Sequence, residues 1–363
     1  MIVDFRKVKT LVIKVGTHSL TKRDGKLDQQ KITLLVEQIA KIKQGRSVVL
    51  VSSGAVGAGI GELALRERPR ALSLLQATAA VGQSVLMSVY RDLFKAQGII
   101  VAQILLAEED FSNRRRYLNF RNTIHRLLRE GVIPIINEND VIATHELKVG
   151  DNDTLSAMIA ANIKAELLIM LSDIDGLYDR DPNHRSARLI EEVHEITPEI
   201  EKLSGKGKGY SVGGIHTKVE AARICMKAGI TMSLVDGSKK GVIHQVLENT
   251  RIGTVFLPQE PANSKEQWLR IARPKGIITI DQGAEKAVLS GKSLLARGIH
   301  DVRGIFDRGD LVIIQGPKKE IGKGLSEYSS DMLGRIKGRT SETIEKLLGF
   351  ASPAIKHDNF ITY

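Results

Sequence analysis

Apolar and polar positions along the first 256 residues follow two different spacings. Segments in which apolar residues return every three or four positions predict helices at 28–44, 76–96, 120–130 and 239–248. Short apolar runs, many of them β-branched, predict buried strands at 10–15, 47–51, 99–106, 132–136, 167–171 and 231–235. Strands that take turns with helices are typical of an α/β domain built on a mostly parallel sheet.

This alternation of helices and strands stops after residue 258. The next stretch contains Pro258, Pro261 and the lone Trp268, and it indicates a linker. Beyond it, short alternating segments separated by turns predict a small β-rich domain. These segments lie at 276–281, 293–295, 310–314 and 319–328. We expect a catalytic domain at 1–258, a linker at 259–275 and a second domain at 276–354.

Composition narrows the class of protein. The chain has 363 residues, of which 42% are hydrophobic and 26% charged, and this suits a globular protein of two or three domains. Its single cysteine, Cys225, cannot form an internal disulfide, and its apolar neighbours indicate a packed helical residue rather than a nucleophile. No early segment has the pattern of a secretion signal, and no apolar run reaches spanning length. We expect a cytoplasmic protein without a membrane partner.

The chain is basic, with 53 Lys and Arg against 42 Asp and Glu and a net charge of +11. Such a charge attracts nucleic acid, nucleotides or acidic metabolites. From residue 259 onward there are 17 basic and 13 acidic side chains, so most of the excess lies before that point. A spread of this kind argues against one dedicated nucleic-acid face, and the charge run at 114–116, between the predicted elements, indicates a solvated face.

The stretch from residue 131 to 163 carries the densest polar cluster. A predicted strand runs into Asn137, Asp140, Asn152 and Asp153, and a helix follows. One such residue is enough to cap a helix, so capping remains an alternative for part of the cluster. The cluster follows the carboxyl end of a strand, which is where open α/β sheets bind ligands.

Two lysines lie beside glycines in this pattern. Lys14 sits in a predicted strand just before Gly16, and it either snorkels from an edge strand or meets phosphate oxygens. Lys218 follows Gly213 and Gly214 at the start of a helix, where backbone N–H groups favour anions. A third glycine-rich turn follows Ser53 and Gly54, but its spacing is not that of a dinucleotide fingerprint, and no Walker A loop is present.

Two ammonium groups near an Asp/Asn cluster suit phosphoryl transfer, in which catalysis is mainly positioning and charge neutralisation. Asp153 is expected to hold both lysines while substrate is absent. A carboxylate acceptor needs no histidine base because it is already ionised at neutral pH. None of the nine histidines has metal-ligand spacing, so no protein metal site is predicted.

Longer motifs give a specific resemblance over nearly the whole chain. They are VIKVGTHSL at 12–20, VSSGAVGAG at 51–59, AAVGQ at 79–83, IPIINENDVIAT at 133–144, KVGDNDTLSA at 148–157, SDIDGLYDRDP at 172–182, GGIHTK at 213–218 and GSKKGVI at 237–243. The chain resembles the amino-acid kinase family, in its glutamate 5-kinase branch, with a C-terminal PUA domain. The resemblance implies a three-layer αβα fold and a β-rich PUA domain.

The resemblance also implies roles for individual residues. It implies catalytic roles for Lys14, Lys218 and Asp153. Glutamate binding is implied for Ser53, Gly54, Asn137, Asp140 and Asn152. ATP binding is implied for Lys14, Gly16, Ser172, Asp173, Val212, Gly213, Gly214, Ile215, His216, Thr217 and Lys218. Val212, Ile215 and His216 depart from the usual residues of the family, so contacts from Val212 have the least support.

The implied reaction is ATP- and Mg²⁺-dependent phosphorylation of the glutamate γ-carboxylate, the first step toward proline, with proline as inhibitor. The resemblance further implies a homo-oligomer, a dimer or tetramer. Asp140 suits a free α-ammonium, which favours glutamate over acetylglutamate. An RNA-binding role of the second domain is an alternative, but its aromatic residues show no stacking pattern. A regulator without activity is disfavoured because both lysines and Asp153 are present.

Overall fold

The computed structural model describes residues 4–22, 24–107, 109–112, 114–142, 152–182, 184–203, 214–259, 269, 272 and 274–362. The chain divides into two compact units. The first joins Met1–Glu108 with Arg121–Pro261, and the second joins Glu109–Phe120 with Ala262–Tyr363. The domain limits expected from the sequence stay a prediction, because the expected linker lies largely outside the described residues.

The first unit is built on an eight-stranded sheet with the order β3-β4-β2-β1-β5-β9-β10-β8. Its strands are β1 (Thr10–Val15), β2 (Ser47–Ser52), β3 (Val101–Leu106), β4 (Ile133–Glu138), β5 (Leu167–Ser172), β8 (Glu192–Val193), β9 (Thr231–Asp236) and β10 (Thr254–Phe256). Neighbouring strands pair in parallel except β10 with β9. The prediction of a mostly parallel sheet is confirmed.

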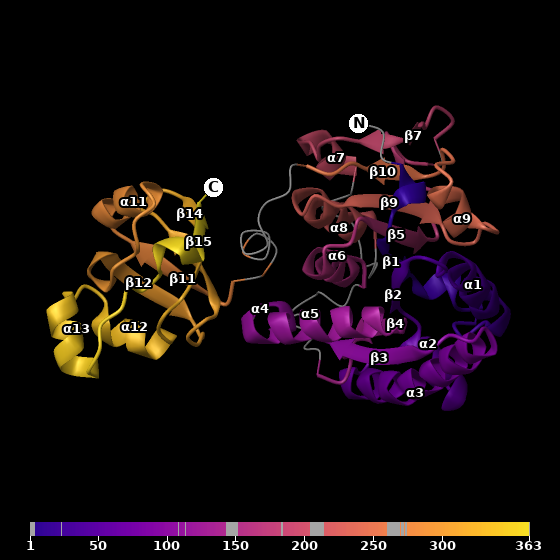
Figure 1. Ribbon diagram of the computed structural model, residues 1–363, viewed down its shortest axis with the longest axis horizontal. Helices are drawn as coiled ribbons and strands as arrows, with labels where there is room; N and C mark the ends of the chain where they lie inside the picture. Colours follow the sequence, from indigo (N-terminus) through magenta and orange to yellow (C-terminus); the bar gives the residue numbers. More distant parts are fainter. Residues whose placement is uncertain are drawn as a thin grey trace. The chain divides into compact units, whose positions relative to one another are not determined.

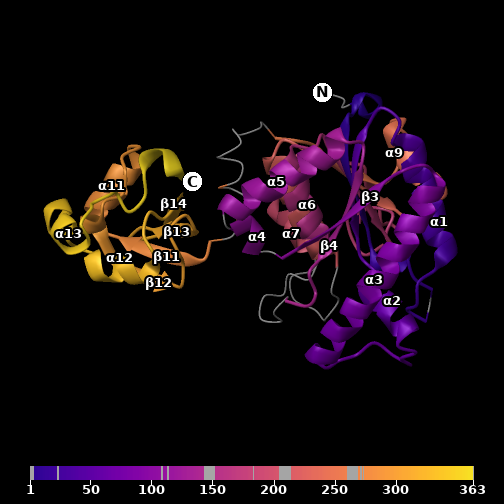
Figure 2. The same cartoon turned by 60° about the horizontal axis from the view of Figure 1, so that its bottom comes forward.

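Helices cover both faces of this sheet. Its longer helices are α1 (Gln29–Ile42), α2 (Ala55–Glu62), α3 (Leu72–Ala96), α5 (Arg114–Arg129), α6 (Asn152–Ile163), α8 (Ile215–Lys227) and α9 (Val242–Leu247). Figures 1 and 2 show α6 and α8 side by side on one face, with α1, α3 and α9 on the other. The short helix α7 (Pro198–Leu203) and the strand pair β6 (Leu177–Tyr178) and β7 (Leu189–Ile190) also belong to this unit, whereas the short helix α4 (Glu109–Ser112) falls in the second unit.

Helix α3 is long and apolar enough to cross a membrane by length and composition, which the apolar-run criterion did not detect. A core helix passes the same test. Leu86, Tyr90 and Phe94 of α3 are buried in the hydrophobic core formed by α1, α9 and the sheet. One face of α3 is therefore part of this core.

The second unit has its own hydrophobic core around Ile278, Val312 and Tyr328. Its sheet has the order β12-β11-β13-β14-β15, and helices accompany it in the described part of this unit. The elements are β11 (Gly276–Ile280), α11 (Gln282–Leu289), β12 (Ile299–Gly304), β13 (Leu311–Gln315), β14 (Glu320–Leu325), α12 (Ser330–Ile336), α13 (Ser341–Leu348) and β15 (Phe360–Thr362). The expectation of a small β-rich unit is confirmed.

Some boundaries expected from the sequence are wrong. Helix α5 begins at Arg114 rather than at residue 120, so the arginine run opens the helix. Helix α9 begins at Val242, after Gly241 at its N-cap, rather than at residue 239. The segment 293–295 forms only an isolated bridge from Leu294 to Ile355.

Candidate active site

Parallel strands bring the predicted residues to one edge of the sheet. Lys14 lies near the end of β1, Asn137 near the end of β4, and Ser172 ends β5. Ser53 follows the last residue of β2. Because β4, β2, β1 and β5 are consecutive in the sheet, their carboxyl ends are neighbours, the position at which open α/β sheets bind ligands.

Lys14 is a central and not an edge residue. Strand β1 pairs with β2 on one side and β5 on the other, opposite Val51 and Met170. Only 5% of Lys14 is exposed. Snorkelling from an edge strand is therefore excluded, and the buried ammonium must be paired within the protein.

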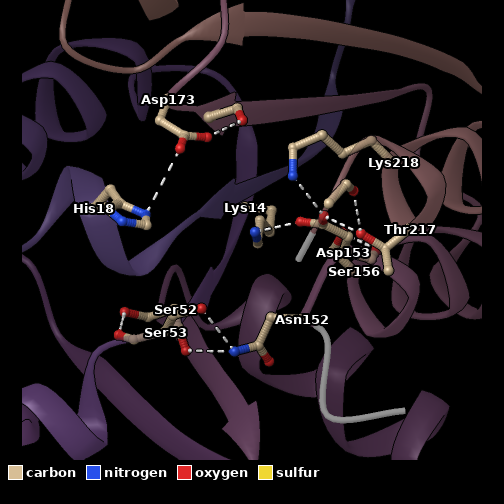
Figure 3. A network of polar contacts seen from close by, with 12 residues as sticks. Lys14, His18, Ser52, Ser53, Asn152, Asp153, Ser156, Asp173, Thr217 and Lys218 are labelled. Atoms are coloured by element: carbon tan, nitrogen blue, oxygen red, sulfur yellow. Dashed lines mark hydrogen bonds and ion pairs between the residues drawn. The ribbon is translucent and has the colours of Figure 1, made fainter. Parts of the chain in front are cut away.

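Asp153 is that partner. Lys14 Nζ forms an ion pair with Asp153 Oδ1, and Lys218 Nζ lies 3.0 Å from Asp153 Oδ2. Thr217 Oγ1 donates to the same Oδ2 at 2.9 Å. Figure 3 shows the two lysines pointing at Asp153 from different elements, β1 and α8. Residues more than 200 positions apart in the chain thus meet at one carboxylate.

The charge of Asp153 is held by its two lysines. Burial alone raises the pKa of this carboxyl, but the nearby Lys14 and Lys218 ammoniums outweigh burial and hold it below its usual range. The side chain of Asp153 is fully buried. Two positive charges and one negative charge leave this cluster with a surplus positive charge, which an anion can neutralise.

A second polar group lies beside this cluster. Asn152 Nδ2 donates to Ser53 Oγ at 2.9 Å and to Asn137 Oδ1 at 3.0 Å. Asn137 Nδ2 in turn donates to Gln83 Oε1 at 2.8 Å. Asn152 and Asp153 are consecutive residues in the first turn of α6, so the amide group and the charged cluster are held by one helix. Helix capping alone, the alternative left open for this cluster, does not account for these side-chain contacts.

Among the nucleotide residues expected from the sequence, Gly16 lies beside Lys14. Gly16 N–H donates to Leu171 O at 3.3 Å, which ties the turn after β1 to β5. A Cβ at Gly16 would lie 3.5 Å from Lys14 Nζ, so the glycine leaves room beside the ammonium. Ser172 Oγ donates to Asp173 Oδ1 at 3.0 Å, and exposed His18 lies 3.7 Å from Asp173 Oδ2.

Other predicted residues are less closely connected. Asp140 is half-buried in the turn after β4, and burial raises its pKa while the charge of Arg68 opposes the rise. Gly54 is the N-cap of α2 with φ of 104°, a conformation that favours glycine. Gly214 is the N-cap of α8, whose first residues are Ile215 and exposed His216. Val212 and Gly213 lie outside the described residues.

The sequence did not single out Gln83 or His18 as site residues. Both lie inside quoted motifs, AAVGQ and VIKVGTHSL, and that was the available signal.

Cys225 is buried in α8, and burial raises the pKa of its thiol, which agrees with a packing role. The part of the chain that the structure describes holds no group of three or more His, Cys, Asp or Glu able to bind a metal.

Comparison with known proteins adds to this geometry. The amino acid kinase family model matches residues 9–236, and the PUA domain model matches residues 276–348. The glutamate 5-kinase of Thermoanaerobacter sp. is 44% identical over 97% of both chains. The chain belongs to the amino acid kinase family, among the glutamate 5-kinases. The glutamate 5-kinase of Moorella thermoacetica is 45% identical over 98% of this chain and 96% of its own, and that of Methanosarcina barkeri is 44% identical over 97% and 96%.

The kinase domain also has a known fold. Carbamate kinase from Giardia lamblia bound to AMP-PNP superposes with a TM-score of 0.50 at 20% identity, over 70% of this chain and all of that chain. The fold class expected from the sequence, an amino-acid kinase fold with a β-rich PUA domain, is confirmed by both family models and by the two sheets.

Proposed function

We propose that this chain phosphorylates the γ-carboxylate of L-glutamate with ATP, giving L-glutamyl 5-phosphate in the first step of proline biosynthesis. The observation that supports it most is the ion-pair cluster of Lys14, Lys218 and Asp153 beside the amide group of Asn137 and Asn152. A surplus positive charge suits a phosphoryl group in transfer. The adjacent amide and hydroxyl groups suit a small amino acid. Full-length relatives that are glutamate 5-kinases agree with this choice.

In this proposal Lys14 and Lys218 contact the phosphoryl group as it moves. A glutamate γ-carboxylate oxygen forms a bond to the γ-phosphorus of ATP while the bond from that phosphorus to the β–γ bridging oxygen breaks, and ADP leaves. No proton moves at neutral pH because the acceptor carboxylate is ionised. Asp153 keeps the two ammoniums together before the anion arrives and orients them afterwards.

Glutamate binding is assigned to Ser53, Gly54, Asn137, Asp140 and Asn152. Asn137 lies near the end of β4, the others follow β2 or β4, and Asn152 begins α6 next to Asp153. Asp140 is suited to the α-ammonium of a free amino acid, because a carboxylate and an ammonium form a charge-assisted hydrogen bond. Acetylglutamate lacks that ammonium and is expected to be a poor substrate.

Nucleotide binding is assigned to Lys14, Gly16, Ser172, Asp173 and residues 212–218. Mg²⁺ commonly binds through substrate phosphates with one or two carboxylates. The described residues fit that arrangement rather than a protein cage, because both Asp153 oxygens face lysines. We assign Mg²⁺ to the ATP phosphates, where it neutralises charge.

A hydroxamate assay tests the proposed function. Acyl phosphates react with hydroxylamine, so glutamate, ATP, Mg²⁺ and hydroxylamine together should give glutamyl hydroxamate. Acetylglutamate and aspartate serve as matched controls and should give far less. Equal or faster product formation from acetylglutamate would reject glutamate as the substrate.

Further properties belong to the same proposal. Proline is expected to inhibit by binding at or near the glutamate residues, and a proline titration of the hydroxamate assay measures this. We also propose a cytoplasmic location, a homodimer or homotetramer, and domain limits of 1–258 and 276–354 around the linker at 259–275.

A further inference from the structure

The orientation of the Asn137 side chain is fixed by a backbone group. The N–H of Glu138 donates to Asn137 Oδ1 at 2.9 Å. A backbone N–H is only a donor, so the oxygen of this amide must face it and the nitrogen must face the other way. That nitrogen meets Gln83 Oε1 at 2.8 Å. The usual ambiguity between amide oxygen and nitrogen is therefore absent at Asn137.

The orientation of Asn137 determines that of Asn152. Because Asn137 presents its oxygen, Asn152 must present its amide nitrogen, at 3.0 Å. The same nitrogen donates to Ser53 Oγ at 2.9 Å. Asn152 Oδ1 then points away, and it is buried without a hydrogen-bond partner among the described residues. A buried acceptor without a donor is unfavourable, so this oxygen is available to accept from the donor group of a bound substrate.

The same direction of hydrogen bonding leaves the Ser53 hydroxyl available as a hydrogen-bond donor. Its oxygen accepts from Asn152, so its O–H can donate elsewhere. Glutamate at neutral pH has one donor group, the ammonium, and two acceptor groups, the carboxylates. The free acceptor of Asn152 therefore matches the ammonium, and the free donor of Ser53 matches a carboxylate.

Gln83 is held in place by close packing of its helix. A Cβ on the preceding residue, Gly82, would lie 1.8 Å from Ala55 O of α2, so α3 approaches the α2 backbone directly. Tyr90 lies seven positions later, and its hydroxyl is hydrogen-bonded to Ser52 Oγ at 2.8 Å. Seven residues are about two helical turns, so one face of α3 supports the ends of both β2 and β4.

We propose that Gln83 is a positioning residue: it accepts from Asn137 Nδ2 and holds this amide in the orientation that the Glu138 N–H sets, so that Asn152 accepts from the substrate ammonium. The inference rests on the proposed function. Gln83 acts through Asn137 and touches neither the phosphoryl group nor the nucleotide residues. Its contribution therefore belongs to glutamate binding.

Kinetics of three variants test this role. Gln83→Met keeps the size of the side chain but removes its acceptor, and we expect KM for glutamate to rise roughly 5- to 10-fold, the effect of one neutral hydrogen bond. KM for ATP should stay within about twofold, because the nucleotide residues do not depend on this contact. Gln83→Glu keeps an acceptor and should recover most of the glutamate affinity. Ser84→Ala, at an exposed neighbour on α3, is the matched control.

The possible outcomes distinguish failure of the proposed function from failure of the role proposed for Gln83. Wild-type protein that forms no glutamyl hydroxamate rejects the function itself. Wild-type activity with an unchanged glutamate KM in Gln83→Met rejects the role of Gln83. A parallel rise of KM for ATP, or an equal loss in Gln83→Glu and Gln83→Met, also rejects it, because a general structural defect produces both.

Discussion

At the scale of single residues, the central feature is a buried carboxylate between two buried ammoniums. Asp153 is fully buried, and Lys14 and Lys218 are each 5% exposed. Charges at such depth are stable only when they are paired. One carboxylate pairs two lysines, so a transferring phosphoryl group finds one positive charge in excess. In the proposed mechanism, substrate binding and catalysis both use this excess of positive charge.

Loss of one lysine ammonium should lower the turnover rate far more than it lowers the stability of the fold. Lys218→Ala is expected to lower turnover by about 10²- to 10³-fold, the scale of one preorganised charge contact in a transition state. The control is Lys227→Ala, an exposed lysine in the last turn of the same helix. Steady-state rates at saturating substrates measure the effect. Near-normal turnover of Lys218→Ala would contradict the assigned role.

The lowered pKa of Asp153 predicts a pH dependence of stability. A depressed pKa means that the carboxylate stabilises the folded state above its ordinary value of 3.8, and that this contribution is lost as the pH falls through the lower folded value. Asp153→Asn should lower the free energy of unfolding at pH 7 by about 3–5 kcal/mol, because two buried ammoniums lose their partner.

Urea unfolding of both proteins across pH checks the sign. The difference between wild type and Asp153→Asn should be constant from neutral pH to about pH 5 and should shrink only below pH 3.8. A difference that grows on acidification would contradict the ion-pair assignment.

Charged candidate site residues are easier to recognise in the sequence than neutral ones. Lys14 inside an apolar strand and Lys218 after two glycines both violate an ordinary pattern, so they are visible in the sequence. Gln83 violates none, because a glutamine fits any helix surface. Its contact with Asn137 depends on the crossing of α3 over the sheet, and spacing along one chain does not contain that information.

At the scale of elements, the contact of α2 with α3 positions the glutamate side of the site. A Cβ at Gly59 of α2 would lie 1.9 Å from Thr78 O, and one at Gly82 of α3 would lie 1.8 Å from Ala55 O. These glycines permit two helices to touch backbone to backbone. The glycine-rich stretch after β2 thus has a packing role in addition to any role in binding.

Adding one methyl group at this contact should separate the helices. Gly59→Ala is expected to lower the free energy of unfolding by about 1–3 kcal/mol or more, the cost of overpacking a close contact. Gly61→Ala is the matched control in the same helix, because its Cβ would be 3.8 Å from the nearest atom, in Lys26. That change should be neutral or stabilising by about 0.5–1 kcal/mol. Equal effects of both changes in thermal unfolding would contradict the packing assignment.

Elements with strong apolar patterns were predicted well, and partly exposed ones were not. Helix α1 (Gln29–Ile42) matches the helix expected at 28–44, and the structure adds that Asp28 caps it by accepting from Gln30 and Lys31 N–H. Strand β12 was missed because much of Ile299–Gly304 is half-buried or exposed and includes charged residues. The start of α5 was placed late because three arginines hide the helical spacing of the residues that follow.

At the scale of the whole molecule, the chain combines a kinase unit with a separate β-rich unit that has its own core. Alternating βα elements and the later loss of that alternation predicted this division from sequence. The limits of the units were harder to place, since Glu109–Phe120 belongs with the C-terminal unit, although residues 121–261 separate the two segments in the chain. Grouping of distant segments in space cannot be read from the local spacing of apolar and polar residues in the sequence.

The distribution of charge predicts weak RNA binding by the whole chain. The net charge of +11 is spread along the sequence. From residue 259 onward the chain has 17 basic and 13 acidic residues, so its basic excess there is small. Gel-shift titration with structured RNA should give only non-specific affinity, with Kd on the order of 10⁻⁴ to 10⁻⁶ M at physiological salt. Tight and strongly salt-sensitive binding would show that the PUA domain has an RNA partner.

The convergence of Lys14 and Lys218 on the transferred phosphoryl group is the claim on which the proposed mechanism depends. A crystal structure with ADP, Mg²⁺, glutamate and aluminium fluoride, which mimics the phosphoryl group in transfer, tests it directly. Both ammoniums should then contact the fluoride group, with Asp153 still bridging them. A fluoride group bound away from either lysine would contradict the mechanism.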